Sequence, residues 1–190
     1  MPQNDVGIYA SQISGHLWAP NGAYDALATV TVGSTSVATI DFTGIPTGYK
    51  HLQLRGIVQN TASSNSSGWL QCRINGDTGS NYTYHFLSGG GSSASTGAGA
   101  NQSAMLLGDS VNSGAGASTF APFIIDVLDY ASTSKTKTFR SLTGVETNSW
   151  GEIYLSSGLW NSTSAVTSIS FYTASYNLKQ YSQIALYGIK

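Results

Sequence analysis

Metal binding is the first chemistry for which the sequence holds candidate ligands, beginning with its three histidines, His16, His51 and His85. They fall in different expected elements and show neither H-x-H nor H-x3-H spacing, so we expect no zinc site. Calcium has three candidate oxygen ligands, Asp77, Asp126 and Asp129. We favour a simpler interpretation, in which Asp77 caps a turn and Asp126 pairs with an arginine of a neighbouring strand. The candidate arginines are Arg55, Arg73 and Arg140.

Covalent catalysis would need a nucleophile with a general base beside it. Gly108-Asp109-Ser110 is similar to the motif that begins one class of serine esterases, but that class places its histidine near the C-terminus, and here no histidine follows position 85. No G-x-S-x-G motif occurs either. Cys72 alternates with Leu70 and Ile74, which is typical of a core residue. We therefore expect no catalytic nucleophile.

Sugar chemistry leaves two alternatives, hydrolysis and binding. Hydrolysis needs two carboxyl groups roughly 5 to 10 Å apart. Glu146 and Glu152 are the only two glutamates, and Glu146 falls in an expected turn. Binding needs exposed aromatic rings beside polar groups. The candidate glycan contacts are three tryptophans near strand ends, Trp69, Trp150 and Trp160. The competing interpretation places them in the core or in an interface.

The charged fraction of the sequence is unusually low. Only 9% of the 190 residues are charged, with a net charge of -1, whereas an average soluble domain has roughly 25%. Ser, Thr, Asn and Gly number 29, 19, 11 and 22, so neutral groups must cover most of the surface. An apolar content of 41% with 11 tyrosines argues against a disordered chain. The charge balance argues against a nucleic-acid partner, and no apolar run is long enough to span a membrane.

The spacing of apolar residues predicts an all-β fold. Period-2 alternation indicates ten short strands, at 27–32, 37–42, 50–58, 68–75, 81–87, 122–130, 136–143, 151–157, 166–172 and 182–189. The first two flank Gly33-Ser34-Thr35-Ser36 and are expected to form a hairpin, and Asn75-Gly76-Asp77 predicts a tight turn. We expect an antiparallel β-sandwich, a jelly roll of about eight strands plus the N-terminal hairpin, with an immunoglobulin-like sandwich as the alternative.

Two segments depart from this pattern. Residues 1–25 are irregular and are expected to form an extended arm ahead of a single domain, 26–190. The arm's candidate partner contacts are its apolar residues Ile8, Tyr9, Ile13, Leu17 and Trp18. Residues 88–119, rich in Gly, Ser and Ala, are expected to form a long loop. We expect this loop either to be disordered or to form a contact between protomers at Met105, Leu106 and Leu107.

One expected strand is apolar on both of its faces. From Phe123 to Tyr130, only Asp126 and Asp129 are charged. A strand of this kind is usually covered on both sides. We therefore expect its outer face to be covered by the arm, by a loop or by another subunit.

Four stretches of the chain resemble a group of small structural proteins encoded by tailed bacteriophages. They are IDFTGIPTGYKHLQLRGI (40–57), CRINGDTGSNYTYHFL (72–87), IIDVLDYASTSKTKTFR (124–140) and YSQIALYGIK (181–190). The resemblance runs from about residue 27 to the C-terminus and lies in strand and turn sequences, so it carries no site residues. It implies a non-enzymatic, trimeric virion protein with a jelly-roll fold.

The role implied by this resemblance is that of a capsid decoration or cement protein. Such a protein would form a homotrimer and bind the major capsid protein with its arm. The alternative is a tail-fibre or tail-associated receptor-binding module that recognises host surface glycans. Both roles need no catalytic residue, metal, cofactor, nucleic acid or membrane. The chain has a single cysteine and hence no internal disulfide, so we expect it to be synthesised in the host cytoplasm. The resemblance implies a final location in the virion, most specifically on the capsid surface.

Overall fold

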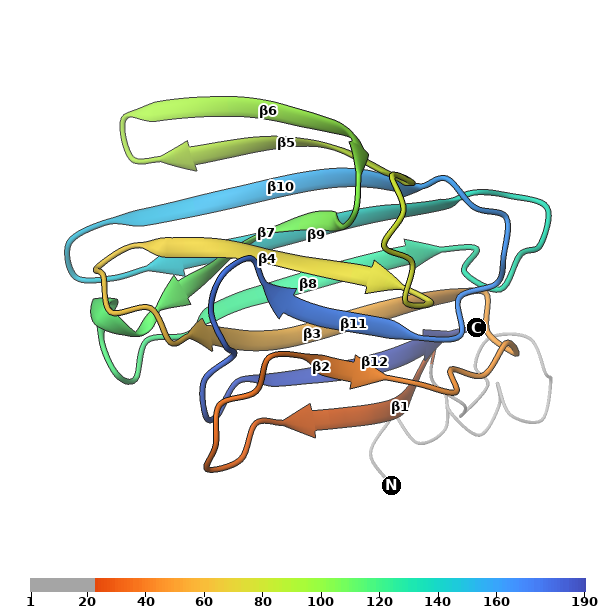
Figure 1. Ribbon diagram of the computed structural model, residues 1–190, viewed down its shortest axis with the longest axis horizontal. Coiled ribbons are helices and arrows are strands. Elements are labelled where there is room, and N and C mark those ends of the chain that lie inside the picture. Colours follow the sequence, from red (N-terminus) through yellow and green to blue (C-terminus); the bar gives the residue numbers. More distant parts are fainter. Residues whose placement is uncertain (1–22) are drawn as a thin grey trace, which may run out of the picture.

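The computed structural model describes residues 23–190, which form twelve strands arranged in two layers (Figure 1). The strands are β1 (Tyr24–Thr31), β2 (Ile40–Phe42), β3 (His51–Asn60), β4 (Ser67–Ile74), β5 (Tyr82–Gly90), β6 (Ser93–Gln102), β7 (Met105–Asn112), β8 (Ala121–Leu128), β9 (Lys137–Glu146), β10 (Gly151–Trp160), β11 (Ile169–Thr173) and β12 (Gln183–Ile189). A 3-10 turn, η1 (Ser113–Ala115), follows β7. The predicted all-β fold is confirmed.

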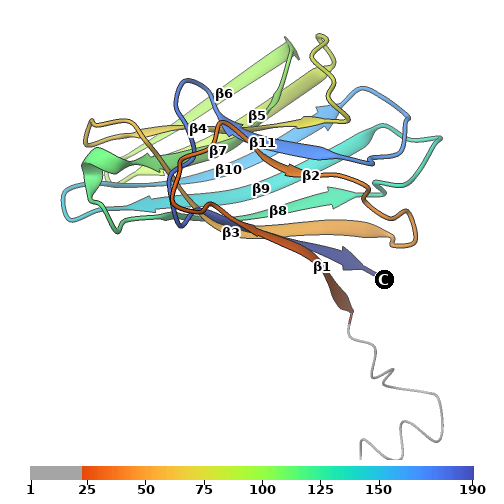
Figure 2. The same ribbon diagram turned by 60° about the horizontal axis from the view of Figure 1, so that its bottom comes forward.

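Two sheets face each other and form a β-sandwich. The large sheet has the strand order β1-β12-β3-β8-β9-β10-β5-β6, and the small sheet has the order β2-β11-β4-β7. Figure 2 shows β2, β4 and β11 as one layer over β3, β8 and β9. The sheets join where β7 runs parallel to the end of β3, pairing Gln59 with Val111 and Asn60 with Asn112.

The expected N-terminal hairpin is wrong. β1 pairs with β12 in the large sheet and β2 pairs with β11 in the small sheet, so the chain crosses between the sheets after Gly33-Ser34-Thr35-Ser36. A turn sequence indicates where the chain bends but not which strand comes to lie beside it.

The tight turn at Asn75-Gly76 is confirmed, with φ angles of 52° and 68°. This turn also connects the two sheets, because it leads from β4 of the small sheet to β5 of the large one.

The expected long loop at 88–119 is also wrong, because most of this segment forms β6 and β7. β6 is poor in large residues for a steric reason. A Cβ on Gly97 would lie 2.5 Å from the ring of Phe86, and one on Gly99 would lie 2.6 Å from the ring of Tyr84, both on the neighbouring β5. Glycine is needed for this close approach, although glycine-rich composition is typical of loops.

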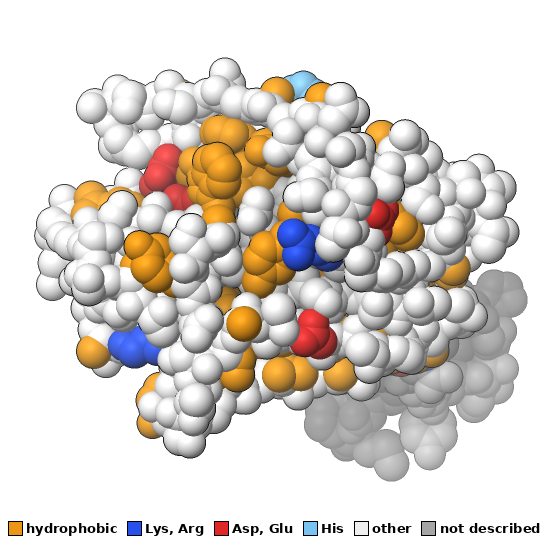
Figure 3. Space-filling model, viewed as in Figure 1, with side chains coloured by type: hydrophobic (Ala, Val, Ile, Leu, Met, Phe, Trp, Pro, Cys, Tyr) orange, Lys and Arg blue, Asp and Glu red, His pale blue; other side chains and the backbone are white. Residues whose placement is uncertain are grey.

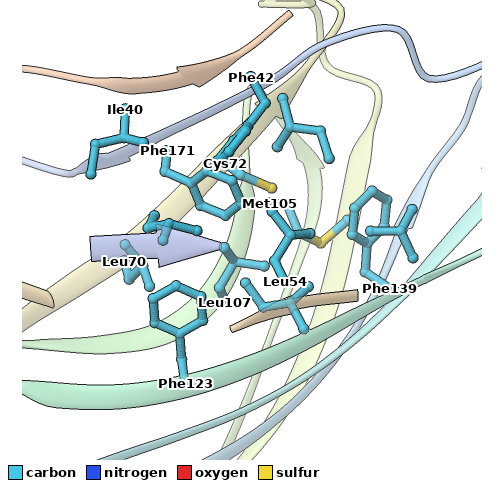
Figure 4. Close-up of a cluster of buried hydrophobic side chains, with 14 of the residues drawn as sticks. Ile40, Phe42, Leu54, Leu70, Cys72, Met105, Leu107, Phe123, Phe139 and Phe171 are labelled. Carbon is cyan, nitrogen blue, oxygen red and sulfur yellow. The ribbon is translucent and has the colours of Figure 1, made fainter. Parts of the chain in front are cut away.

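The core fills the space between the sheets. Leu70, Cys72 and Ile74 of β4 point inward and are buried, as the alternation predicts. Figure 4 shows Leu70, Cys72 and other side chains of the small sheet gathered with Leu54 of β3, Phe123 of β8 and Phe139 of β9. Phe171 bridges the layers, because its ring lies 6.2 Å from that of Phe42 on β2 and 6.4 Å from that of Phe123 on β8. Aromatic pairs at these distances stabilise a core beyond their buried area.

The edge strand β7 is buried along its whole length. A bulge between Gly108 and Leu106 leaves Leu107 without a partner on β4, and the Leu107 carbonyl accepts a hydrogen bond from the Ser141 hydroxyl of β9. The amide of Asp109 donates to the Thr143 hydroxyl at 3.2 Å. Side chains of the large sheet thus satisfy backbone groups that β7 cannot pair within its own sheet.

Replacing Gly108 with alanine is expected to destabilise the protein strongly. Gly108 has a φ of 135°, and a Cβ there would lie 2.2 Å from the Thr143 hydroxyl oxygen. Backbone strain and overpacking together are expected to cost about 2–5 kcal/mol of unfolding free energy. Urea unfolding followed by circular dichroism measures this cost. The control is Gly33→Ala, where a Cβ meets no atom within 4 Å. Equal stability of the two variants would contradict the role of the bulge.

Candidate functional site

The outer face of the large sheet carries a row of apolar side chains across four neighbouring strands. Leu87 of β5, Leu155 of β10 and Leu142 of β9 stand directly opposite one another, and Ile124 of β8 continues the row. Leu87 and Leu155 are 50% and 48% exposed, and Ile153 lies beside them on β10. We call these five residues the apolar face. Together with Ser88, Gly89 and Ala94, four of them line a shallow hollow of about 320 Å³.

A polar row borders the apolar face. Gln53 of β3 donates to one carboxylate oxygen of Asp126 at 2.8 Å, and Arg140 of β9 donates to the other at 3.1 Å. Arg55 donates in turn to the Gln53 side chain at 2.7 Å. The predicted pairing of Asp126 with an arginine is therefore confirmed, with Arg140 as the partner. Because the pair is partly exposed, its contribution to stability is about 0–1 kcal/mol.

Within residues 23–190, no segment covers the outer face of β8. Pro122 and Leu128 are exposed at its two ends, and Ile124 is only half-buried. Of the three covers expected from the sequence, a loop of the described domain is therefore wrong. Residues 1–22, which include the candidate arm contacts Ile8, Tyr9, Ile13, Leu17 and Trp18, lie outside the described residues.

The outer face of the small sheet carries aromatic side chains around one arginine. Trp69 and Arg73 share this face of β4, and Tyr172 shares it on β11. The guanidinium carbon of Arg73 lies 4.8 Å from the centre of the Tyr172 ring, a cation–π contact. Trp69 is 46% exposed, and Tyr176, in the loop after β11, is 51% exposed. Figure 3 shows that charged side chains are few on this side of the molecule.

Two neighbouring hollows lie on this face. The larger, of about 500 Å³, is lined by Arg73, Tyr172 and Tyr176 and by hydroxyl and amide side chains. The smaller, of about 260 Å³, is lined by Trp69 and Tyr176. Residues 173–176 line both hollows, so the two adjoin at this segment, and we call them together the aromatic groove. Pockets that combine aromatic walls with a few polar groups are typical binding sites for small ligands.

The structure separates the three tryptophans that the sequence analysis proposed as glycan contacts. Trp160 is 3% exposed and its indole NH donates to Asp77 at 2.7 Å, so it is a core residue. The indole NH of Trp150 donates to the Asn65 side chain at 3.0 Å, and its ring packs against the core. Of the three, only Trp69 lines the aromatic groove. Tyr176 was not predicted from the sequence, because its exposure depends on a loop that has no strand pattern.

Met105, Leu106 and Leu107 do not lie in a loop contact between protomers. They belong to β7 and each is 1% exposed. The apolar run of three residues thus indicates a buried strand, and the bulge explains why two neighbouring leucines can both point into the core.

The groups weighed for catalysis have structural roles. The Ser110 hydroxyl is buried, donates to the Gly68 carbonyl at 2.8 Å and accepts from Asn60 at 2.9 Å. Burial raises the pKa of the Cys72 thiol, which disfavours the reactive thiolate. In the described part of the chain, no three His, Cys, Asp or Glu side chains gather as metal ligands would.

Among residues 23–190, Asp109 is the one carboxylate whose surroundings shift its pKa strongly upward. It is 4% exposed; one oxygen accepts from the Ser67 hydroxyl, and the other has no hydrogen-bond partner among the described residues. Burial raises its pKa to about 6, the Ser67 hydrogen bond opposes this rise, and the charge of Glu152 adds to it. A buried carboxylate with an unpaired oxygen destabilises the fold when ionised.

Comparisons with known proteins leave the chain without an assigned family. No family model, no curated protein and no solved structure matches it. No helix among the described residues is long and apolar enough to cross a membrane.

Replacing Asp109 with asparagine is expected to stabilise the protein at neutral pH. The folded-state pKa of about 6 lies above the ordinary value of 3.8, so the folded state binds the proton more tightly than the unfolded state. Below about pH 4 the carboxyl group is protonated in both states and costs no unfolding free energy. The loss of unfolding free energy grows as the pH rises from about 4 through 6, and it reaches about 2–3 kcal/mol. Asparagine removes the charge and keeps the shape.

The measurement is the unfolding free energy of wild type and Asp109→Asn between pH 4 and 8. The difference between them is expected to widen with pH and to level off above about pH 7. The control is Asp41→Asn, which changes an exposed carboxylate. A difference that is constant across the pH range would overturn the assignment.

Proposed function

We propose that this chain is a non-enzymatic structural protein of a tailed-bacteriophage virion, specifically a capsid decoration or cement protein that works as a homotrimer. The observation that carries this proposal is the apolar face. Its three leucines and Ile124 stand in register on four hydrogen-bonded strands, so they form a rigid surface and not a set of scattered exposed residues. Contiguous apolar surface of this kind marks an interaction site.

The occupant of the apolar face is a second copy of this chain. The polar row beside it has a carboxylate already paired with an arginine, so two copies can approach without exposing unpaired acids to each other. The apolar centre with a polar border is the usual arrangement of a homomeric interface. A low charged fraction favours the same occupant, because closely packed copies repel less.

The strand pairing supports a jelly roll with two insertions. β1 pairs with β12, β2 with β11, β3 with β8 and β4 with β7. In this nested order the first strands pair with the last ones and the middle strands pair with each other, as they do when a long antiparallel hairpin rolls up into a jelly roll. The pairs β5–β6 and β9–β10 are insertions that widen only the large sheet. They also supply Leu87, Leu142 and Leu155, so the apolar face lies mainly on the insertions.

Placing a charge in the apolar face is expected to dissociate the oligomer. Leu155→Asp buries an unpaired carboxylate in the proposed contact, which weakens association by at least about 100-fold. Sedimentation velocity over a range of concentrations measures the change. The control is Tyr181→Asn, which alters an exposed residue with a φ of 72° that asparagine tolerates, outside the apolar face. A monomeric wild type, or an unchanged oligomer in Leu155→Asp, would refute the assembly role.

Deleting residues 1–20 is expected to leave a folded domain that no longer binds capsids. The twelve strands of residues 23–190 lie after this segment, so they keep the pairing partners that they have in the two sheets. Binding of full-length and truncated protein to capsids that lack the decoration protein is compared by co-sedimentation. The arm hypothesis fails if the truncated protein binds as tightly as the full chain.

The second candidate is a tail-associated receptor-binding module. It is favoured by one observation, the exposed Trp69 and Tyr176 at the aromatic groove. The number of copies in a purified virion separates the two roles. Hundreds of copies indicate the capsid lattice, whereas a few dozen or fewer indicate the tail.

A further inference from the structure

We propose that the aromatic groove binds an acidic oligosaccharide, one that contains a uronic or sialic acid. Trp69 and Tyr176 hold sugar rings, and Arg73 receives the carboxylate. The groove lies on the outer face of the small sheet, and the apolar face lies on the outer face of the large sheet. The inference therefore does not depend on the assembly role.

The aromatic contribution follows from the exposure of two rings. Trp69 and Tyr176 are about half exposed although both are large and apolar, and both line the same hollow. One face of a sugar ring carries C–H groups, which pack against the electron-rich face of an aromatic ring. A ligand with such a face removes this apolar surface from water without needing a fully apolar partner.

The surroundings of Arg73 are the reason to expect an acidic group in the ligand. Its Nε donates to the Ser103 carbonyl at 3.1 Å and its guanidinium lies over Tyr172, which hold the group in place. No carboxylate of residues 23–190 lies within 4.0 Å of it, whereas Arg140 has Asp126. A positioned guanidinium without a carboxylate partner favours a ligand that brings one.

The nearest acidic position on this face does not neutralise Arg73. Arg73 stands opposite Ser170, and Ser170 stands opposite Asp41 on β2. Two strand spacings of about 4.8 Å separate the backbones of Arg73 and Asp41. The carboxylate of Asp41 instead accepts a hydrogen bond from the Thr39 hydroxyl at 2.7 Å.

The length and lining of the groove favour an oligosaccharide over a single sugar. Trp69 and Arg73 are four residues apart on one strand, which corresponds to about 13 Å. This distance is longer than one sugar ring. The remaining lining includes the polar residues Thr39, Thr78, Ser175 and Asn177. Hydroxyl and amide groups both donate hydrogen bonds to sugar hydroxyls and accept hydrogen bonds from them. One arginine is also too few for a nucleic acid.

The experiment compares acidic oligosaccharides with matched neutral ones on the full-length protein. The probes are trigalacturonic acid and its methyl ester, and sialyllactose and lactose, each titrated by isothermal calorimetry. We expect at least one acidic probe to bind, and its neutral partner to bind at least about 10-fold more weakly. Absence of binding to both acidic probes, or equal binding of an acid and its neutral partner, would overturn the proposal.

Three variants assign the roles within the groove. Trp69→Ala is expected to weaken binding of acidic and neutral probes alike by about 10-fold or more, whereas Trp69→Phe retains part of the affinity. Arg73→Gln is expected to remove the preference for the acid and to leave the neutral probe unchanged. The control is Tyr181→Asn, which changes an exposed tyrosine outside the groove. Unchanged binding in Trp69→Ala, or a retained acid preference in Arg73→Gln, would overturn the assignment. Oligomer size, measured in the same samples, reports separately on the assembly role.

Discussion

The structure depends on how the backbone amide and carbonyl groups of β7 find hydrogen-bond partners. β7 is the last strand of the small sheet and is buried along its length, so unpaired amide and carbonyl groups on its free edge would be costly. The hydroxyls of Ser141 and Thr143 on β9 supply the missing partners, and Gly108 allows the close approach to Thr143. This contact seals one side of the sandwich and explains why the core-facing side of β9 carries hydroxyl residues there.

A second polar cluster joins the sheets where β3 and β7 run parallel. The Asn60 side chain donates to the Ser110 hydroxyl at 2.9 Å and to the Asn112 side chain at 2.7 Å, and Asn112 donates in turn to Ser64 at 2.9 Å. These groups are uncharged, so their burial avoids the large desolvation cost of ions. The abundance of Ser, Thr and Asn in the sequence thus serves the interior as well as the surface.

The difference in size between the two sheets creates the two candidate surfaces. The large sheet is extended by β9, β10, β5 and β6, and the outward side chains of β5, β9 and β10 form most of the apolar face. The small sheet ends at β7, and its outward side chains form the aromatic groove with the loop after β11. One surface is mainly apolar, whereas the other combines exposed aromatic rings with a single cation, Arg73. The two can therefore be tested, and can evolve, independently.

Alternation along the sequence was enough to predict the β class, the positions of ten strands and the inward face of strands such as β4, because alternation follows directly from the geometry of an extended chain. Leu70, Cys72 and Ile74 are buried as that alternation requires, and the pairing of Asp126 with an arginine was foreseeable from opposite charges on expected strands. The sequence could not identify β6, since its glycines are needed by rings on another strand.

Tertiary structure alone decided which strands pair and which side chains remain exposed. β1 and β2 lie in different sheets despite the turn between them, because pairing depends on segments more than a hundred residues away. Trp69 and Trp160 look alike in the sequence, yet one is exposed on the small sheet and the other is buried against Asp77. The physical reason is that burial depends on what lies opposite a side chain, and the opposite side is supplied by distant parts of the chain.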